Sequence, residues 1–167
     1  ENEPNKNLFL AFAYISHWDY ARAVAPLLRY IHHPKPADYD KLVARTNLVH
    51  VLVSSKQYDE AHSHIESMLK DTRDGGHWLL HGNILESAVV RATELGDIRQ
   101  AEEFWETATK LHQRSDPVTR LHLRLRRLVL NLHANPNDEG SLKQLEILGK
   151  QAREFRSWEM WRLCDWY

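Results

Sequence analysis

The chain has 167 residues, of which 43% are hydrophobic and 27% are charged. This length suits one compact domain or a short repeat array, and this composition argues against disordered, collagen-like and membrane-spanning classes. The 22 basic and 23 acidic residues leave a net charge of −1, which removes any general electrostatic attraction to nucleic acid or anionic lipid.

Glycine and proline residues fall mainly between segments with helical periodicity, and no segment alternates between apolar and polar residues as a strand would. We therefore expect an all-α protein. The predicted helices, nine in number, cover residues 5–16, 20–32, 38–54, 58–72, 78–95, 98–114, 117–134, 139–155 and 157–167.

Several helix ends carry specific signals. Asp19, Asp97 and Asp138 each stand where a carboxylate can accept hydrogen bonds from the free amides of a first helical turn, so each is predicted to cap the helix that follows. Gly96 is predicted to end the helix before it. Pro26 lies seven residues into the second helix and is expected to kink or open it, unless the surroundings compensate.

The helices form pairs, and the pairs repeat. Ala23, Ala61 and Ala101 recur at intervals of 38 and 40 residues, each near the start of the second helix of a pair. Because a small side chain lets two antiparallel helices approach closely, we expect these alanines to be buried where the helices cross. Each alanine follows a bulky residue by three positions, namely Tyr20, Tyr58 and Ile98.

This pattern resembles the tetratricopeptide repeat, a helix-turn-helix unit that stacks into a right-handed superhelix. The units here are longer and degenerate, as in the superhelical domains of bacterial transcription regulators, and Trp18 and Lys56 stand where the repeat consensus prefers glycine. The resemblance implies a single TPR-like domain over residues 1–167, with about four helical hairpins and a terminal helix. A non-repetitive helical bundle is the structural alternative. The repeats are expected at about residues 5–34, 38–74, 78–115 and 117–155, followed by the terminal helix at 157–167.

In a solenoid of this kind the first helix of each hairpin lines the concave face, which is the expected binding surface. The alternative is that these side chains contact only neighbouring repeats or solvent. Arg126 and Arg127 belong to a basic stripe that suits an acidic ligand, or that pairs with Glu102, Glu103 or Glu106. The candidate ligand-binding or peptide-binding residues are Asn47, His50, Asn83, Glu86, Arg126 and Arg127.

Eleven histidines invite a metal hypothesis. His77 and His81 are four residues apart, and His62 and His64 are two apart, but neither pair has the further ligands that zinc needs. We therefore interpret them as surface or capping residues, and we expect no metal site and no cofactor. The sequence also lacks a nucleophile elbow and a phosphate loop, so we expect no catalytic residues and no enzyme activity.

Three tryptophans crowd the last segment of the chain. Trp158 and Trp161 lie one helical turn apart, so they share a face, and Trp166 lies beyond them. These three residues are candidate interface residues, through which the chain is expected to form a homo-oligomer. The alternative is an ordinary terminal cap that buries the rings against the fourth hairpin.

Two functions of different kinds remain after these exclusions. The first is a module that binds a protein, a peptide or a small effector and serves as a regulatory or sensor part of a larger signalling or transcription-regulatory protein. The second is a structural or self-association segment without a free groove ligand. No membrane association is expected, and direct nucleic-acid binding is disfavoured because no aromatic platform accompanies the arginines. The single cysteine, Cys164, excludes an internal disulfide framework and fits a cytoplasmic location.

Overall fold

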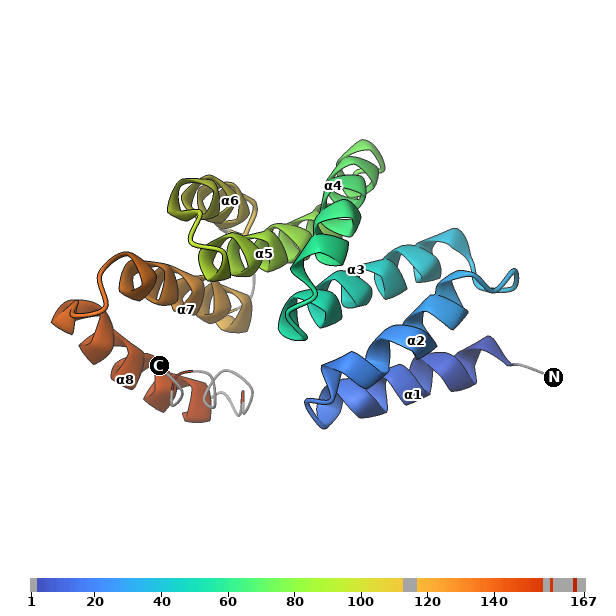
Figure 1. Ribbon diagram of the computed structural model, residues 1–167, viewed down its shortest axis with the longest axis horizontal. Coiled ribbons are helices and arrows are strands. Elements are labelled where there is room, and N and C mark those ends of the chain that lie inside the picture. Colours follow the sequence, from blue (N-terminus) through green and yellow to red (C-terminus); the bar gives the residue numbers. More distant parts are fainter. Residues whose placement is uncertain (1–2, 113–116, 155–156, 158–163, 165–167) are drawn as a thin grey trace. The chain divides into compact units, whose positions relative to one another are not determined.

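The computed structural model describes residues 3–112, 117–154, 157 and 164, and within these ranges it contains helices, turns and bends but no strand (Figure 1). The all-α class is therefore confirmed. No helix of the described part is both long and apolar enough to cross a membrane. The eight helices are α1 (Pro4–Ser16), α2 (Tyr20–Ile31), α3 (Asp38–Ser54), α4 (Tyr58–Asp74), α5 (Trp78–Glu94), α6 (Ile98–Leu111), α7 (Pro117–Ala134) and α8 (Glu139–Glu154).

These eight helices correspond to the first eight predicted segments, and their bounds differ from the predicted ones by three residues at most. The ninth predicted helix, at 157–167, lies outside the described residues except for Ser157 and Cys164. Helices that follow one another in the sequence pack against one another, including α1 with α2, α3 with α4, and α7 with α8. The predicted hairpins are thus present as pairs of neighbouring helices.

The first three hairpins share one turn geometry. The central residue of each turn has a left-handed backbone, with φ of 61° at Trp18, 61° at Lys56 and 76° at Gly96. The helix carbonyls left unpaired at the C-terminus are satisfied by this geometry, in the manner of a Schellman motif. The hydrogen bond that closes each turn joins an amide to the carbonyl five residues earlier, at 2.9 Å in all three cases: Asp19 to Tyr14, Gln57 to Leu52 and Asp97 to Ala92.

This shared geometry is consistent with the repeat in the sequence. The left-handed residues of these three turns recur at the same intervals, 38 and 40 residues, as the three alanines. Gly76, in the connection between α4 and α5, has the same geometry, with φ of 69° and a hydrogen bond of 2.8 Å from the His77 amide to the Thr72 carbonyl. The connection between α7 and α8 is built differently, because the Asp138 amide donates to the Asn135 carbonyl, only three residues earlier, at 3.1 Å. The fourth hairpin, which lacks the alanine, therefore also lacks the turn.

The repeated alanines occupy the interior as predicted. Ala23, Ala61 and Ala101 are each 0% exposed. Ala101 of α6 packs in one cluster with Ala92 of α5 and Leu130 of α7, so it lies where its own hairpin meets the next one. The small side chain leaves room for this contact between three helices.

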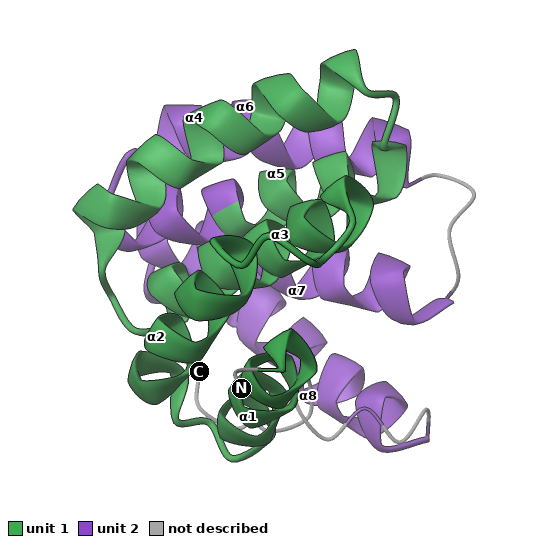
Figure 2. Cartoon of the chain, turned by 90° about the vertical axis from the view of Figure 1, so that its right-hand side faces the viewer, with its two compact units in different colours: residues 1–87 green, residues 88–167 purple. Residues whose placement is uncertain are grey.

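The chain divides into two compact units, residues 1–87 and residues 88–167, shown in green and purple in Figure 2. The border falls inside α5, between Ser87 and Ala88. In the first unit the largest fully buried side chains include Leu27, Leu48, Leu52, Met68 and Ile84. In the second unit α7 and α8 share a core that contains Leu125, Leu128, Leu132, Leu145 and Leu148.

The predicted helix caps are confirmed at two positions and wrong at one. Asp97 accepts a hydrogen bond from the Gln100 amide at 3.0 Å, and Asp138 accepts one from the Gly140 amide at 3.1 Å. The Asp19 carboxylate caps no amide of α2, because it instead binds the Arg22 guanidinium at 3.1 Å. The helix α2 continues from Tyr20 to Ile31 through the buried Pro26.

Candidate functional site

A row of three aromatic rings connects the first hairpin turn to α3. Trp18 lies in the turn, Tyr20 begins α2, and His50 lies in the C-terminal half of α3. The ring centroids of Trp18 and Tyr20 are 6.1 Å apart, and those of Tyr20 and His50 are 5.6 Å apart, both with edge-to-face geometry. All three side chains are half-buried. The contacts therefore fix the orientation of each ring while part of its surface stays in contact with water.

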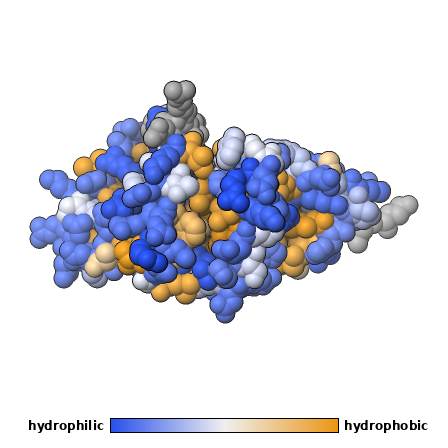
Figure 3. All heavy atoms as spheres, turned by 90° about the horizontal axis from the view of Figure 1, so that it is seen from above, coloured by the Kyte–Doolittle hydropathy of each residue, from blue (hydrophilic) through white to orange (hydrophobic). Residues whose placement is uncertain are grey.

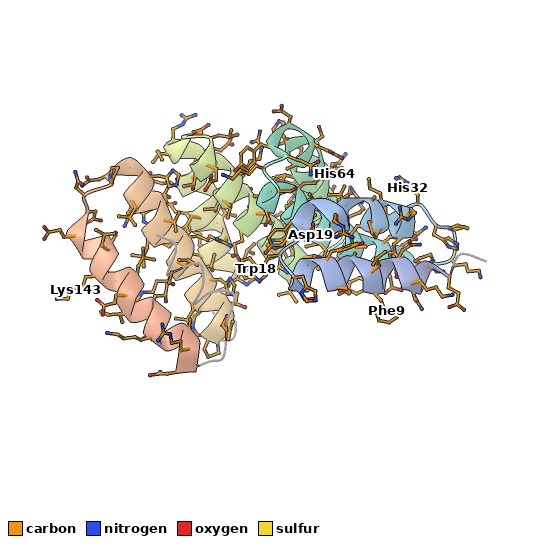
Figure 4. All side chains as sticks on the ribbon, turned by 60° about the horizontal axis from the view of Figure 1, so that its bottom comes forward. Phe9, Trp18, Asp19, His32, His64 and Lys143 are labelled. Atoms are coloured by element: carbon orange, nitrogen blue, oxygen red, sulfur yellow. The ribbon has the colours of Figure 1, made fainter. Side chains whose placement is uncertain are left out.

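Trp18 holds its place in this row at a cost to the backbone. A left-handed conformation costs an ordinary residue roughly 1 to 2 kcal/mol, whereas glycine adopts it freely. Gly96 occupies the corresponding position in the third hairpin. Figure 4 shows Trp18 beside Asp19 at the tip of the α1–α2 hairpin. Lys56 has the same φ in the second hairpin turn, so the backbone conformation belongs to the turn and not to Trp18 alone. Trp18 makes this turn a candidate site because its ring contacts Tyr20 and remains partly exposed.

The predicted site residue Asn47 lies on α3 three positions before His50, so both side chains are on neighbouring parts of one helix face. The Asn47 Nδ2 donates a hydrogen bond to the Val43 carbonyl at 2.9 Å, which fixes the carboxamide on the helix surface. This bond uses one N–H donor of the carboxamide and does not involve its Oδ1 atom, which is a hydrogen-bond acceptor. The row of rings therefore adjoins a positioned amide, and α3 carries two of the six predicted residues.

The predicted residues Asn83 and Glu86 lie on α5, the first helix of the next hairpin, within the first unit. Asn83 is exposed, and Glu86 is half-buried. The first-unit part of the predicted surface is thus distributed over the first helices of two successive hairpins.

Arg127 has internal partners in the second unit. Its Nη1 atom lies 3.3 Å from Glu102 Oε1, and its guanidinium lies over the Trp105 ring at 5.0 Å from the centroid. The Trp105 Nε1 in turn donates to the Leu123 carbonyl at 2.8 Å. These contacts join α6 to α7, so Arg127 takes the pairing role that the sequence left as an alternative. Arg126 beside it is half-buried.

The interpretation of His81 as a surface or capping residue is wrong. His81 is only 8% exposed, and its Nδ1 atom is hydrogen-bonded to Thr72 Oγ1 at 2.9 Å. Trp78 packs edge-on against the ring at 6.2 Å. Burial, and secondarily the positive charge of Arg73, lower the pKa of His81 below its ordinary value. The sequence did contain a signal, because Ile84 follows His81 by three positions on the apolar stripe of α5.

His77, which precedes His81 by four positions, contacts an aromatic ring of α3. His77 is half-buried, and its ring lies 5.5 Å from that of Tyr39. Among the described side chains, no group of three or more histidine, cysteine, aspartate or glutamate residues is placed to hold a metal ion.

The interface candidates Trp158, Trp161 and Trp166 lie outside the described residues.

A scan against protein-family models, a search of curated proteins and a search of solved structures each found no match. The repeat is therefore defined within this chain, by the shared turn geometry and by the buried alanines at equivalent positions.

Proposed function

We propose that this chain is a TPR-like binding module without catalytic activity of its own, arranged as a right-handed α-α superhelix. It recognises a protein or peptide, or a small effector, and serves as a regulatory part of a cytoplasmic signalling or transcription-regulatory protein. The repeated left-handed turns at Trp18, Lys56 and Gly96 and the buried alanines support the TPR-like architecture.

The observation that carries the binding function is the row formed by Trp18, Tyr20 and His50, with Asn47 beside it. Rigid aromatic side chains supply contact area while losing little conformational entropy. The indole and phenol rings suit an apolar side chain of a ligand, and the imidazole and carboxamide suit the polar groups of a peptide backbone. We therefore propose a peptide that places an apolar side chain on Trp18 and its backbone along α3.

The structural or self-association function is the second candidate, and a specific observation favours it. Arg127, which was predicted to bind a ligand, is engaged by Glu102 and Trp105 of the same chain. A surface whose side chains are used internally in this way stabilises the array and offers less to a ligand. This observation concerns the second unit, whereas the row of rings belongs to the first.

A peptide selection with two glycine variants distinguishes these functions. Peptides are selected from a displayed random library on the full chain, and their affinities are then compared for Trp18→Gly and for Lys56→Gly. Both substitutions place glycine at a left-handed turn position, so neither strains the backbone, but only the first removes a ring of the row. We expect Trp18→Gly to weaken binding by about tenfold or more, as for an aromatic hot spot, and Lys56→Gly to leave it unchanged.

Two outcomes would contradict the proposed binding site. Equal affinity of the selected peptides for both variants would mean that the ligand does not contact the row of rings. A selection that yields no peptide, combined with self-association of the chain in sedimentation, would favour the scaffold function instead.

A further inference from the structure

His81 is a titratable side chain in the interior of the first unit. The view in Figure 3 shows a mostly hydrophilic face on which hydrophobic residues emerge between hydrophilic ones. His81 differs from such surface residues, because it is only 8% exposed and Trp78 packs edge-on against its ring at 6.2 Å. Since histidine changes its charge near neutral pH, a buried histidine couples the packing around it to the proton concentration.

The contacts of the ring with α4 determine which ring nitrogen carries the hydrogen. Thr72 Oγ1 lies 2.6 Å from the Met68 carbonyl oxygen and 2.9 Å from His81 Nδ1. A hydroxyl group has one hydrogen and a carbonyl can only accept, so the shorter contact directs this hydrogen to Met68. His81 Nδ1 then donates to Thr72 Oγ1. The neutral ring is thus held as its Nδ1–H tautomer, and a further proton must bind at Nε2.

The surroundings of the ring favour this neutral form. Burial lowers the pKa of His81 most, and the positive charge of Arg73 lowers it further, whereas a hydrogen bond to the Leu69 carbonyl raises it. The Arg73 guanidinium is itself paired with Asp74 at 3.5 Å. Among the described groups, no carboxylate contributes to the shift in this pKa. A positive charge on the ring is therefore poorly compensated in the closed structure.

His77 is the other histidine at this end of α5, one helical turn before His81. Its ring contacts Tyr39 of α3, with the ring centroids 5.5 Å apart. It also packs on the backbone of the connection between α4 and α5, since a Cβ atom at Gly75 would lie only 2.8 Å from it. His77 is thus the nearby titratable group from which the effect of His81 must be separated.

The hydrogen bond between Thr72 and His81 spans a connection that contains two successive glycines. Gly76 has a left-handed backbone, with φ of 69°, and the His77 amide donates to the Thr72 carbonyl at 2.8 Å. Glycine changes its backbone conformation at low cost, and hinges consist of a few residues that absorb such changes. The connection is therefore suited to act as a hinge once the side-chain bond across it is lost.

We propose that Thr72 and His81 form a proton-operated latch that holds the start of α5 against α4. The neutral ring keeps the latch closed by donating to Thr72. Binding of a proton at Nε2 favours release of the ring into water, and the connection then opens at the glycine pair while the core of the first unit stays folded. This device does not depend on the peptide proposed for the row of rings.

The direction of the pH dependence follows from the preference of the closed junction for the neutral ring. Above about pH 6.5 the ring is neutral in the closed and the open form, so the latch stays closed. As the pH falls below this value, the open form binds a proton more readily than the closed form. The opening equilibrium then rises by up to about tenfold per pH unit, the limit for the uptake of one proton.

Hydrogen exchange measured by NMR between about pH 7.5 and 5.5, and corrected for the intrinsic exchange rate, tests the latch. The amides of His77 and His81 report on the junction. The amides of Leu48 and Leu52, which are buried in α3, report on unfolding of the first unit. We expect the junction amides to lose protection as the pH falls, by up to about tenfold per pH unit, and to exchange faster than the α3 amides throughout. The ¹⁵N shifts of the neutral His81 ring should show the Nδ1–H tautomer.

His81→Asn is the informative variant, because the carboxamide can still donate to Thr72 but does not titrate. It should make the protection of the junction amides independent of pH in this range. His62→Asn is the matched control, since it makes the same substitution at an exposed histidine of α4, and it should leave the pH dependence unchanged.

Three results would overturn the proposal. If the junction amides exchanged at the same rate as those of Leu48 and Leu52, the opening would be unfolding of the whole unit. If His81→Asn kept the pH dependence, the proton would bind elsewhere. If His77→Asn alone abolished it, the dependence would belong to the contact of His77 with Tyr39.

Discussion

The left-handed residue Lys56 allows a direct test of the repeat geometry. Its side chain is exposed and its φ is 61°, so glycine can replace it without removing a buried contact. Relief of the left-handed conformation contributes about 1 to 2 kcal/mol, and the greater freedom of glycine in the unfolded chain offsets about 0.5 to 1 kcal/mol of this. We therefore expect Lys56→Gly to raise the free energy of unfolding by about 0.5 to 1 kcal/mol.

The prediction is measured by thermal and urea unfolding, monitored by far-ultraviolet circular dichroism. For a chain of this size the expected gain corresponds to a rise in Tm of about 1 to 4 °C. Lys70→Gly is the matched control, because Lys70 is also an exposed lysine but lies inside α4. It should lower the free energy of unfolding by about 1 kcal/mol, as glycine does in a helix interior. If Lys56→Gly were as destabilising as Lys70→Gly, the shared turn geometry would be wrong.

Three further predictions concern packing, pH and charge. Ala61→Leu should cost about 1 to 3 kcal/mol by overpacking, and an unchanged Tm would contradict the assigned hairpin contact. As the pH falls below about 6.5, His81 binds a proton more readily in the unfolded chain than in the folded chain, so the free energy of unfolding should fall. In urea titrations at several pH values, His81→Asn should make this fall shallower. An equally steep fall in the variant would assign the pH dependence to other groups. A double-mutant cycle on Arg127 and Glu102, which are 37% and 47% exposed, should give a coupling of about 0 to 1 kcal/mol, and repulsion would contradict the pairing.

The helices could be predicted because their ends depend on local chemistry. Pro117 begins α7, Gly96 follows α5, and Asp97 caps α6, and each acts through its own backbone or through residues within one turn. Asp19 does not cap α2, and the reason is again a contact within one helical turn. Arg22 lies one turn later and competes for the carboxylate, while its guanidinium also lies over the Tyr14 ring.

The candidate site was harder to predict because it depends on contacts between helices. Asn47 and His50 were identified from their register on the first helix of a hairpin, but the contact of His50 with Tyr20 crosses from α3 to α2. The departure of Trp18 from the glycine consensus was visible in the sequence, but the backbone conformation that this residue adopts was not. Likewise, the burial of His81 depends on Thr72 from another helix. Residue spacing reports positions along one helix, and it does not report which neighbour covers them.

The border between the two units has a consequence for how structure is lost. It leaves ten residues of α5 in the first unit and seven in the second. Both parts of α5 are packed, because Ile84 in the first unit and Val89 in the second are buried. Unfolding of one unit would therefore break the hydrogen bonds of α5 that cross the border, because each joins an amide to the carbonyl four residues earlier. A protease would find no loop at this border, and cleavage there must wait for α5 to open.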